Sequence, residues 1–413
     1  MEETLGTMND SPSLDHILTR VLPVNRSDIY DVSFGQDDHF LESFQFSLRD
    51  GLTASHLKDA VGKLIGSDIP VAFPTETVYG LGAIATKRSA VQRIFATKGR
   101  PADNPLIVHV CSIGQLRQLL RPNQTQAKSN NISDPIPKIY ESLIKKFWPG
   151  PLTILLPCPE NSELAPEVHP GLKTFSVRIP SDVLALALIK LSGPIAAPSA
   201  NASTKPSTTT AEHVKQDLDG RIEVILDGGP CTVGVESTVI DGLRELPCIL
   251  RPGGISLEQI RQCKGWENAE IGYNTLPKEM PRAPGMKYRH YSPNASVILY
   301  KAGSEGPTID YARNVGIVRT MSWKSIITDV SLAKNHINPI LPSPTPVLCS
   351  PEHMIWEVWL GSDLRDIARE LFSALRKLDD RRVDAIHIEG VPETDDLAAT
   401  IMNRLRKAAL TIR

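Results

Sequence analysis

Five short stretches of the chain combine cationic, hydroxyl and small residues in a way that could bind an anionic ligand. They are PTET (74–77), KGRPADNPL (98–106), APSAN (197–201), VESTV (235–239) and LRPGG (250–254). Lys98, Arg100 and Arg251 offer fixed positive charge and several donors for phosphate or carboxylate oxygens. Small hydroxyl residues and glycines let backbone amides approach the same ligand. Each stretch alone is equally consistent with turn chemistry, but together they predict a pocket for phosphate and carboxylate groups.

Two common nucleotide-binding motifs do not account for this set. The chain has no G-x-x-x-x-G-K-[ST] sequence, which excludes a P-loop as the means of holding a nucleotide. Residues 80–85 read GLGAIA and fit G-x-G-x-x-A, and Asp103 lies near the offset expected for a ribose-binding acid. That fingerprint should join a strand directly to the helix that it opens, whereas polar residues and a tyrosine intervene here. A dehydrogenase is therefore disfavoured.

The surrounding pattern places the five stretches next to strands. Apolar runs predict strands at 69–73, 106–110, 153–156, 175–179, 195–197, 223–226, 237–241 and 248–251, and helical periodicity is present at 55–65, 90–96, 139–147 and 183–191. Helices and strands alternate loosely, which favours a mixed α/β sheet over a strictly parallel one. In open α/β sheets the ligand crevice lies outside the carboxyl ends of the strands, so these loops are expected to converge on one pocket.

The chain divides into four segments by pattern. Residues 1–52 show no sustained period and are expected to be an N-terminal extension. Residues 53–272 form the main α/β pattern, with a polar surface insertion at 121–135, and 273–294 form a proline-interrupted linker. Residues 295–413 carry a second α/β pattern, with strands at 296–300, 315–318 and 385–388 and helices at 364–378 and 395–410. Thr394 is the expected N-cap of the last helix.

Composition narrows the classes of function. The 413 residues carry a formal net charge of −2, which argues against coating nucleic acid by bulk charge, although a local basic patch stays open. Six cysteines are scattered without a C-x-x-C pair, so neither a disulfide framework nor a structural zinc site is expected. The N-terminus is acidic and polar, and no apolar run approaches the roughly 18 residues that span a bilayer. A cytoplasmic protein without a membrane partner is expected.

A longer series of motifs carries a family resemblance. The chain contains, in this order, FPTETVYGLG, KGRPADNPLIVHV, WPGPLT, RIP, APSAN, DGG, GVESTV, LRPGG, PGMKYRHYSP and MNRLRKAA. From about residue 54 to the end, this series is similar to the threonylcarbamoyl-AMP synthases of the YrdC/TsaC type, in their longer two-domain form. The resemblance implies a YrdC-like twisted mixed sheet with flanking helices, followed by a linker and a smaller Rossmann-like α/β domain.

The resemblance also implies a reaction. L-threonine, bicarbonate or CO2, and ATP with Mg2+ would give threonylcarbamoyl-AMP and pyrophosphate. Other proteins would then pass the threonylcarbamoyl group to the adenosine next to the anticodon in tRNA. The implied partners are therefore the small-molecule substrates, with transient contact to RNA or to the downstream transfer complex.

Individual roles follow from the same resemblance. It places five residues at the threonine substrate: Thr77, His109, Arg178, Ala197 and Ser237. It places seven at the nucleotide, with Lys98 close by: Arg100, Asn104, Thr174, Ser199, Ser207, Arg251 and Tyr291. Lys98, Arg100 and Arg178 are expected to provide the electrostatic catalysis, and Arg178 suits the threonine carboxylate because a guanidinium can bind it with two parallel hydrogen bonds. His109 is equally consistent with a base and with an orienting group. The linker residues Tyr288, His290 and Tyr291 are expected to close over the pocket.

Two other classes remain open on sequence grounds. The first is an RNA-binding α/β module without catalysis, which the cations would suit but for which the chain offers few aromatic stacking platforms. The second is a carbamoyltransferase that acts on another acceptor. Salt-dependent RNA affinity without ATP turnover would indicate the former, and dependence on carbamoyl phosphate the latter.

Overall fold

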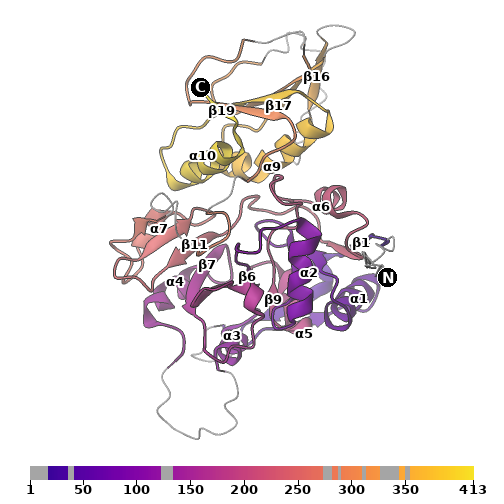
Figure 1. The fold of residues 1–413 in the computed structure, drawn as a ribbon, viewed down its shortest axis with the longest axis vertical. Coiled ribbons are helices and arrows are strands. Elements are labelled where there is room, and N and C mark those ends of the chain that lie inside the picture. Colours follow the sequence, from indigo (N-terminus) through magenta and orange to yellow (C-terminus); the bar gives the residue numbers. More distant parts are fainter. Residues whose placement is uncertain are drawn as a thin grey trace, which may run out of the picture.

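The structure is a computed structural model that describes residues 17–35, 41–121, 134–272, 281–286, 290–308, 313–325, 344–348 and 354–413. It contains two α/β units, stacked along the long axis of the molecule (Figure 1). The larger unit extends from β1 (Arg20–Pro23) to β13 (Glu270–Ile271), and the smaller unit begins at β14 (Ser296–Tyr300). Tyr288 and most of the 121–135 insertion lie outside the described residues. Among the described residues, no helix is long and apolar enough to cross a membrane.

The larger unit is built on a mixed sheet of eleven strands, in the order β1-β10-β4-β5-β9-β6-β8-β7-β11-β12-β13. The strands are β1 (Arg20–Pro23), β4 (Val71–Phe73), β5 (Gly80–Ile84), β6 (Ile107–His109), β7 (Leu152–Pro157), β8 (Thr174–Arg178), β9 (Ile195–Ala196), β10 (Val224–Asp227), β11 (Thr238–Asp241), β12 (Cys248–Arg251) and β13 (Glu270–Ile271). Parallel pairs such as β6/β8 alternate with antiparallel pairs such as β7/β8. The predicted mixed α/β sheet is therefore confirmed.

Helices cover this sheet on both faces (Figure 1). They are α1 (Leu52–Gly66), α2 (Arg88–Lys98), α3 (Ile113–Leu120), α4 (Glu141–Phe147), α5 (Val183–Ser192), α6 (Ala211–Leu218) and α7 (Leu257–Arg261), with short 3-10 turns at η1 (Arg26–Asp28), η2 (Lys138–Tyr140) and η3 (Pro166–Val168). Gly99 caps the C-terminus of helix α2 and has a φ of 63°. Glycine adopts this left-handed conformation at little cost in free energy because it has no Cβ atom. The next residue, Arg100, therefore lies outside the helix.

Two segments of the larger unit differ from the sequence expectation. Strand β1 pairs in parallel with β10, and Leu22 and Phe44 are buried in the main core, so this part of residues 1–52 is integrated into the sheet. A hairpin of β2 (Ile29–Ser33) and β3 (Gln45–Leu48) follows β1. A four-residue strand whose partner lies some 200 residues away leaves no periodic signal. The GLGAIA stretch forms β5, antiparallel to β4, so it does not open a helix as a dinucleotide fingerprint would.

The smaller unit contains a six-stranded sheet, in the order β16-β17-β15-β18-β14-β19. Its strands are β14 (Ser296–Tyr300), β15 (Val315–Arg319), β16 (Thr345–Leu348), β17 (Met354–Trp359), β18 (Ala385–Glu389) and β19 (Thr411–Ile412), and its helices are α9 (Leu364–Asp380) and α10 (Asp396–Ala408). All pairs except β16/β17 are parallel, in agreement with the expected Rossmann-like arrangement. Asp395 rather than Thr394 caps α10, since its side chain accepts from Ala398 N.

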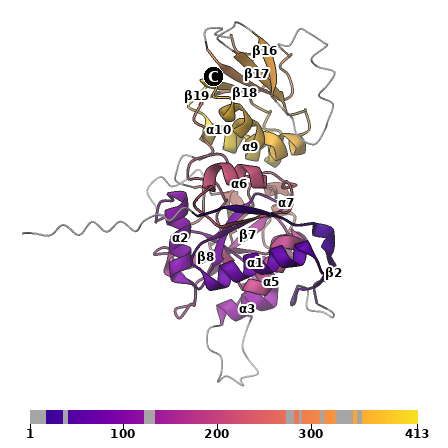
Figure 2. The same cartoon turned by 90° about the vertical axis from the view of Figure 1, so that its right-hand side faces the viewer.

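Helices α9 and α10 lie between their own sheet and the larger unit (Figures 1 and 2). Val235 of the larger unit packs into the hydrophobic cluster of the smaller one, together with Tyr291 of the linker. Gly234 lies directly against α9, since a Cβ atom there would lie 2.3 Å from Arg369 Cα. The units therefore share a packed boundary, directly behind the VESTV stretch.

Candidate functional site

A cavity of about 360 Å³ opens where the loops of the larger unit meet the linker. All but one of the residues predicted for the site line it: Thr77, Lys98, Arg100, Asn104, His109, Arg178, Ala197, Ser199, Ser207, Ser237, Arg251 and Tyr291. The strand order explains this convergence. His109 ends β6 and Arg178 ends β8, and the two residues are register partners in this parallel pair. Arg251 ends β12, which runs antiparallel to β11, so it meets Ser237 at the start of that strand.

Arg178 is the best-defined cation of the cavity. It is 3% exposed, and its Nη1 donates to Thr77 Oγ1 at 3.0 Å while its Nη2 donates to Glu76 Oε1 at 2.5 Å. Its Nε is buried and has no hydrogen-bond partner among the described residues. Because a buried unsatisfied donor costs free energy, this atom indicates a site at which a ligand can accept a hydrogen bond.

The PTET turn holds the partners of Arg178 in place. Thr75 Oγ1 donates to Val78 O at 2.7 Å and accepts from the amides of Thr77 and Val78, at 3.2 and 3.3 Å. Glu76 Oε2 accepts from Ser181 N at 3.2 Å. The two threonines and the glutamate after β4 thus have separate tasks: Thr75 shapes the turn, Glu76 fixes the guanidinium, and Thr77 presents its hydroxyl to the cavity.

His109 is an uncharged neighbour of Arg178. Its Nδ1 lies 3.1 Å from Ile107 O, which makes that nitrogen the donor. Burial and the adjacent guanidinium lower the pKa of His109 to about 3. The imidazole therefore stays neutral at physiological pH and does not compete with Arg178 for an anionic group.

Arg251, at the end of β12, also lines the cavity. Its Nη2 donates to Ser237 Oγ at 3.0 Å, its Nε to Ser237 O at 3.1 Å, and its Nη1 to Pro284 O at 3.3 Å. Ser237 Oγ also lies 2.8 Å from Thr153 Oγ1. Burial lowers the pKa of Arg251 to about 10, so it still carries its charge at neutral pH. This side chain links the VESTV stretch to the linker.

Lys98 and Arg100 lie on the wall formed by the end of α2. Lys98 Nζ donates to Ser199 O at 2.6 Å and contacts Asn201 O, and burial lowers the pKa of Lys98 well below its usual value. Arg100 Nη2 donates to Pro105 O at 2.8 Å. Asn104 Oδ1 is buried and has no hydrogen-bond partner among the described residues. The lysine amine thus contacts the backbone of the APSAN loop at the lining of the cavity.

The linker supplies His290 and Tyr291 to the lining of the cavity. Tyr291 stacks on Phe372 of α9, with ring centroids 5.1 Å apart, and adopts a φ of 66°, which is rare for a non-glycine residue. His290 Nε2 is buried without a hydrogen-bond partner in the described part of the chain. A strained backbone and an unsatisfied donor or acceptor at this position are typical of a functional segment.

Sequence reasoning missed Glu236, which also lines the cavity. Ser207 Oγ donates to its Oε1 at 2.5 Å, and Arg404 Nε of α10 donates to its Oε2 at 2.9 Å. Burial alone would raise the pKa of Glu236, but Arg404, Arg251 and Ser207 hold it at about 2. The VESTV stretch contained the signal, namely an acidic residue among small ones beside predicted phosphate-binding cations.

Thr174 is the exception among the predicted residues. It begins β8, pairs with Pro157, and does not line the cavity, which lies at the other end of the strand. A strand advances about 3.3 Å per residue, so Thr174 lies about 13 Å from the level of Arg178. The predicted contact of Thr174 with a nucleotide is therefore not supported by this geometry.

Among the described residues that line the cavity, Glu236 is the one carboxylate, and it is engaged by Arg404 and Ser207. No group of three or more histidine, cysteine, aspartate or glutamate side chains that could hold a metal ion occurs in the described part of the chain. Mg2+ prefers oxygen ligands and often keeps several waters while it binds substrate phosphates. The described residues that line the cavity therefore offer no carboxylate cluster of their own for a Mg2+ ion.

Comparisons with known proteins agree with this architecture. The Sua5/YciO/YrdC family, described as Telomere recombination, matches residues 63–253, and the family described as Threonylcarbamoyl-AMP synthase, C-terminal domain, matches residues 255–410. A threonylcarbamoyl-AMP synthase of Schizosaccharomyces pombe is 45% identical over 394 residues, which cover 91% of this chain and 93% of that protein. The Bacillus subtilis protein of the same name is 43% identical, over 82% of this chain and 89% of its own length.

A solved structure supports the same comparison. Pyrococcus abyssi Sua5 complexed with L-threonine aligns with a TM-score of 0.71 at 38% identity, and the alignment covers 95% of this chain and 99% of that one. The sheet order, the cavity and the second parallel-sheet unit define a two-domain α/β protein of the Sua5 type. At this level of identity over nearly the whole chain, the protein belongs to the threonylcarbamoyl-AMP synthase family. The family expected from the sequence motifs is thereby confirmed, and membership favours an enzyme over an RNA-binding module.

Proposed function

We propose that this chain condenses L-threonine, bicarbonate or CO2, and ATP into threonylcarbamoyl-AMP and pyrophosphate. The main support for the proposal comes from Arg178. Its buried guanidinium has one nitrogen without a hydrogen-bond partner among the described residues, and the side chain lines the same cavity as Arg100 and Arg251. An amino acid that also carries a hydroxyl group, together with a triphosphate, matches this combination of cations and small hydroxyl residues. The relatives named above are enzymes of this class.

The threonine end of the cavity is formed by Arg178, Thr77 and His109. Arg178 supplies the positive charge for the amino-acid carboxylate, and Thr77 is held at 3.0 Å from its Nη1. Because His109 has a pKa of about 3, it suits an orienting role better than that of a base at neutral pH. Ala197 and Ser237 complete the pocket with small side chains that leave space for the ligand.

The nucleotide end is formed by Arg100, Asn104, Ser199, Ser207 and Arg251. The amine of threonine must attack CO2, and the resulting N-carboxylate must then attack the α-phosphorus of ATP while pyrophosphate leaves. Two anions meet in this step, so fixed guanidinium groups lower the barrier by holding charge that develops there. Most of the rate should come from positioning and electrostatics rather than from a protein nucleophile.

At the nucleotide end, binding of the ligand is also linked to protonation of Lys98. Its pKa is held low by burial, with Arg100 lowering it further, and a bound polyphosphate favours the charged amine. Mg2+ bound to the ATP phosphates would screen the same negative charge. His290 and Tyr291 of the linker would exclude water from the adenylate, which hydrolyses readily.

The product would serve threonylcarbamoyl modification of the adenosine next to the anticodon in tRNA. We place the reaction in the cytoplasm, and we expect transient contact with RNA or with the protein complex that completes the transfer. These last steps rest on family membership alone.

Pyrophosphate release from ATP by the purified protein tests the proposal. Release should require bicarbonate, Mg2+ and L-threonine, should be weak with L-serine or L-valine, and should stop when EDTA replaces Mg2+. Arg178→Ala should remove most of the threonine-dependent rate. Absence of threonine-dependent release at every Mg2+ and bicarbonate concentration would refute the assignment and favour the RNA-binding alternative.

A further inference from the structure

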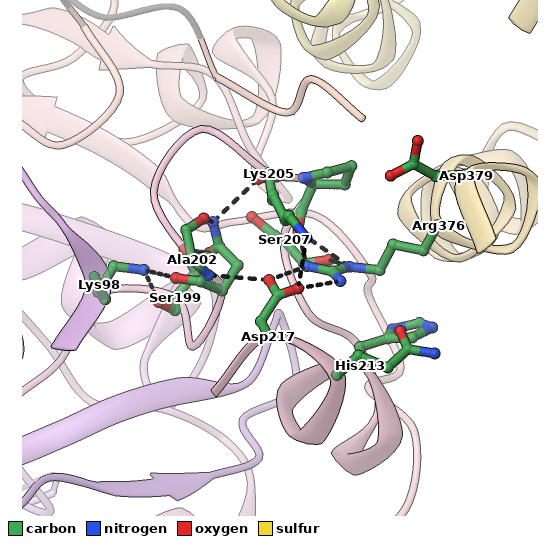
Figure 3. Close-up of polar contacts among 12 residues, drawn as sticks. Lys98, Ser199, Ala202, Lys205, Ser207, His213, Asp217, Arg376 and Asp379 are labelled. Carbon is green, nitrogen blue, oxygen red and sulfur yellow. Dashed lines mark hydrogen bonds and ion pairs between the residues drawn. The ribbon is translucent and has the colours of Figure 1, made fainter. Parts of the chain in front are cut away.

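The loop formed by residues 199–207 carries much of the nucleotide end of the cavity. Its cavity-lining residues are Ser199, Asn201, Ser203, Thr204, Lys205 and Ser207. A loop of this kind needs external contacts to hold one geometry, because fixing each backbone residue costs conformational entropy. Figure 3 shows what surrounds it: Lys98 of α2 on one side, and Asp217 of α6 with Arg376 of α9 on the other.

Arg376 reaches across the boundary between the two units. Its side chain is buried, and its Nη1 and Nη2 donate to the two carboxylate oxygens of Asp217 at 3.1 and 2.8 Å. Its Nε donates to Pro206 O at 3.1 Å, directly next to Ser207. Such a bidentate pair fixes orientation as well as charge. A residue of the C-terminal unit thus contacts the backbone of the nucleotide loop.

Asp217 extends this restraint to the middle of the loop. Its Oδ2 accepts from Ala202 N at 2.9 Å, and Lys205 Nζ lies 3.6 Å from its Oδ1. Burial alone would raise the pKa of Asp217, but Arg376 and the Ala202 amide lower it below its usual value. The carboxylate therefore stays ionised, and it connects the guanidinium of α9 to the middle of the loop.

Lys98 completes the arrangement from the opposite side. Its Nζ donates to Ser199 O and contacts Asn201 O, two residues of the same loop. His213, which lies next to Arg376 in Figure 3, is neutral because burial and Arg376 lower its pKa to about 3. The loop is therefore held between two buried basic side chains, Lys98 and Arg376, one from each unit of the protein.

We infer that Arg376 is a positioning residue for the proposed reaction: through Asp217 and Pro206 it holds loop 199–207 in the geometry that takes up ATP. This inference rests on the proposed function, because it specifies how the nucleotide end of that site is set. It gives the C-terminal unit a definite task, since the unit has no side chain of its own among the predicted substrate contacts. Loss of Arg376 weakens nucleotide binding and leaves the threonine end, at Arg178, unchanged.

Separate binding measurements test the inference. In Arg376→Ala, the Kd of a non-hydrolysable ATP analogue should rise about tenfold or more, within the usual range of coupling between sites, while the Kd of L-threonine should stay close to that of the wild type. Arg376→Lys should fall between, because an ammonium cannot form the bidentate contact. Asp217→Asn should resemble Arg376→Ala, and the double variant should show no further loss if both act through one contact. Arg365→Ala removes an exposed arginine from the same helix and is the matched control.

The outcomes separate the inference from a purely structural role. If Arg376→Ala folds and binds the analogue as tightly as the wild type, or loses both ligands to the same extent, the inference is wrong. If that variant does not fold, Arg376→Lys and Asp217→Asn still decide between the two roles. A wild-type chain that binds the analogue but shows no threonine-dependent pyrophosphate release would refute the proposed function alone, since the binding comparison would still report on the loop.

Discussion

Replacing Arg404 by alanine should destabilise the folded chain by an amount that the structure specifies. Arg404 is about 1% exposed and donates to Glu236 Oε2 at 2.9 Å and to Pro252 O at 2.8 Å. An ordinary glutamate has a pKa of 4.5, whereas Arg404, Arg251 and Ser207 hold the buried Glu236 at about 2. Since one unit of pKa corresponds to about 1.36 kcal/mol, this net shift, which includes the opposing effect of burial, corresponds to ~3 kcal/mol at neutral pH. Breaking a buried ion pair typically costs 3–5 kcal/mol.

The dependence on pH gives this prediction its sign. In the wild type, the contribution of Glu236 is present above pH 4.5 and is lost as the pH falls through about 2. In Arg404→Ala, the buried carboxylate loses the strongest of the charges that lower its pKa, so the pKa of Glu236 rises above its value in the wild type. The variant can then relieve the cost by binding a proton, so its deficit in unfolding free energy should be smaller at pH 5 than at pH 7.5.

Denaturant unfolding at the two pH values measures this effect. Arg406→Ala is the matched control, because Arg406 lies on the same helix and pairs with Glu393 at an exposed position, where a pair is worth at most about 1 kcal/mol. Glu236→Gln should recover part of the stability in the Arg404→Ala background. The reasoning would be refuted if Arg404→Ala were as stable as Arg406→Ala, or if its deficit were the same at both pH values.

Three further outcomes are expected. Arg178→Lys should raise the KM for L-threonine tenfold or more, because a charge-assisted hydrogen bond is worth about 1.5–3 kcal/mol. It should leave the KM for ATP nearly unchanged. Equal effects on the two KM values would contradict the assigned carboxylate contact. Gly234→Ala should lower the free energy of unfolding more than Gly303→Ala does. Both glycines have left-handed φ values, but only at Gly234 would the added Cβ atom meet backbone, 2.3 Å from Arg369 Cα. His109→Gln should lower the rate of pyrophosphate release. The shape of the pH–rate profile between pH 5 and 9 should not change, because the pKa of His109 is about 3. Disappearance of an ionisation from that range would show that the wild-type imidazole titrates there and would contradict the reasoning.

The sequence predicted individual helices and strands, and the residues of the site, better than it predicted contacts between residues far apart in the chain. The strand at 248–251 was predicted with the bounds of β12, and the motif loops do converge on one cavity. Such features depend on nearby residues, whose apolar period and turn chemistry are visible in the chain. Strand β1 was missed because its partner β10 lies far along the sequence. The contact from Arg404 to Glu236 was missed for the same reason, since nothing local to either residue indicates the other.

The same separation has a consequence for synthesis of the protein. Arg404 follows Glu236 by 168 residues, so at about 5–20 residues per second a growing chain contains the carboxylate for roughly 10–30 s before its arginine exists. During that interval the carboxylate of Glu236 remains hydrated, because burying an unpaired charge costs free energy. The wall that contains Glu236 and Ser207 reaches its final geometry only after α10 has been made and has docked. The wall of the cavity that contains Glu236 is therefore completed late in synthesis.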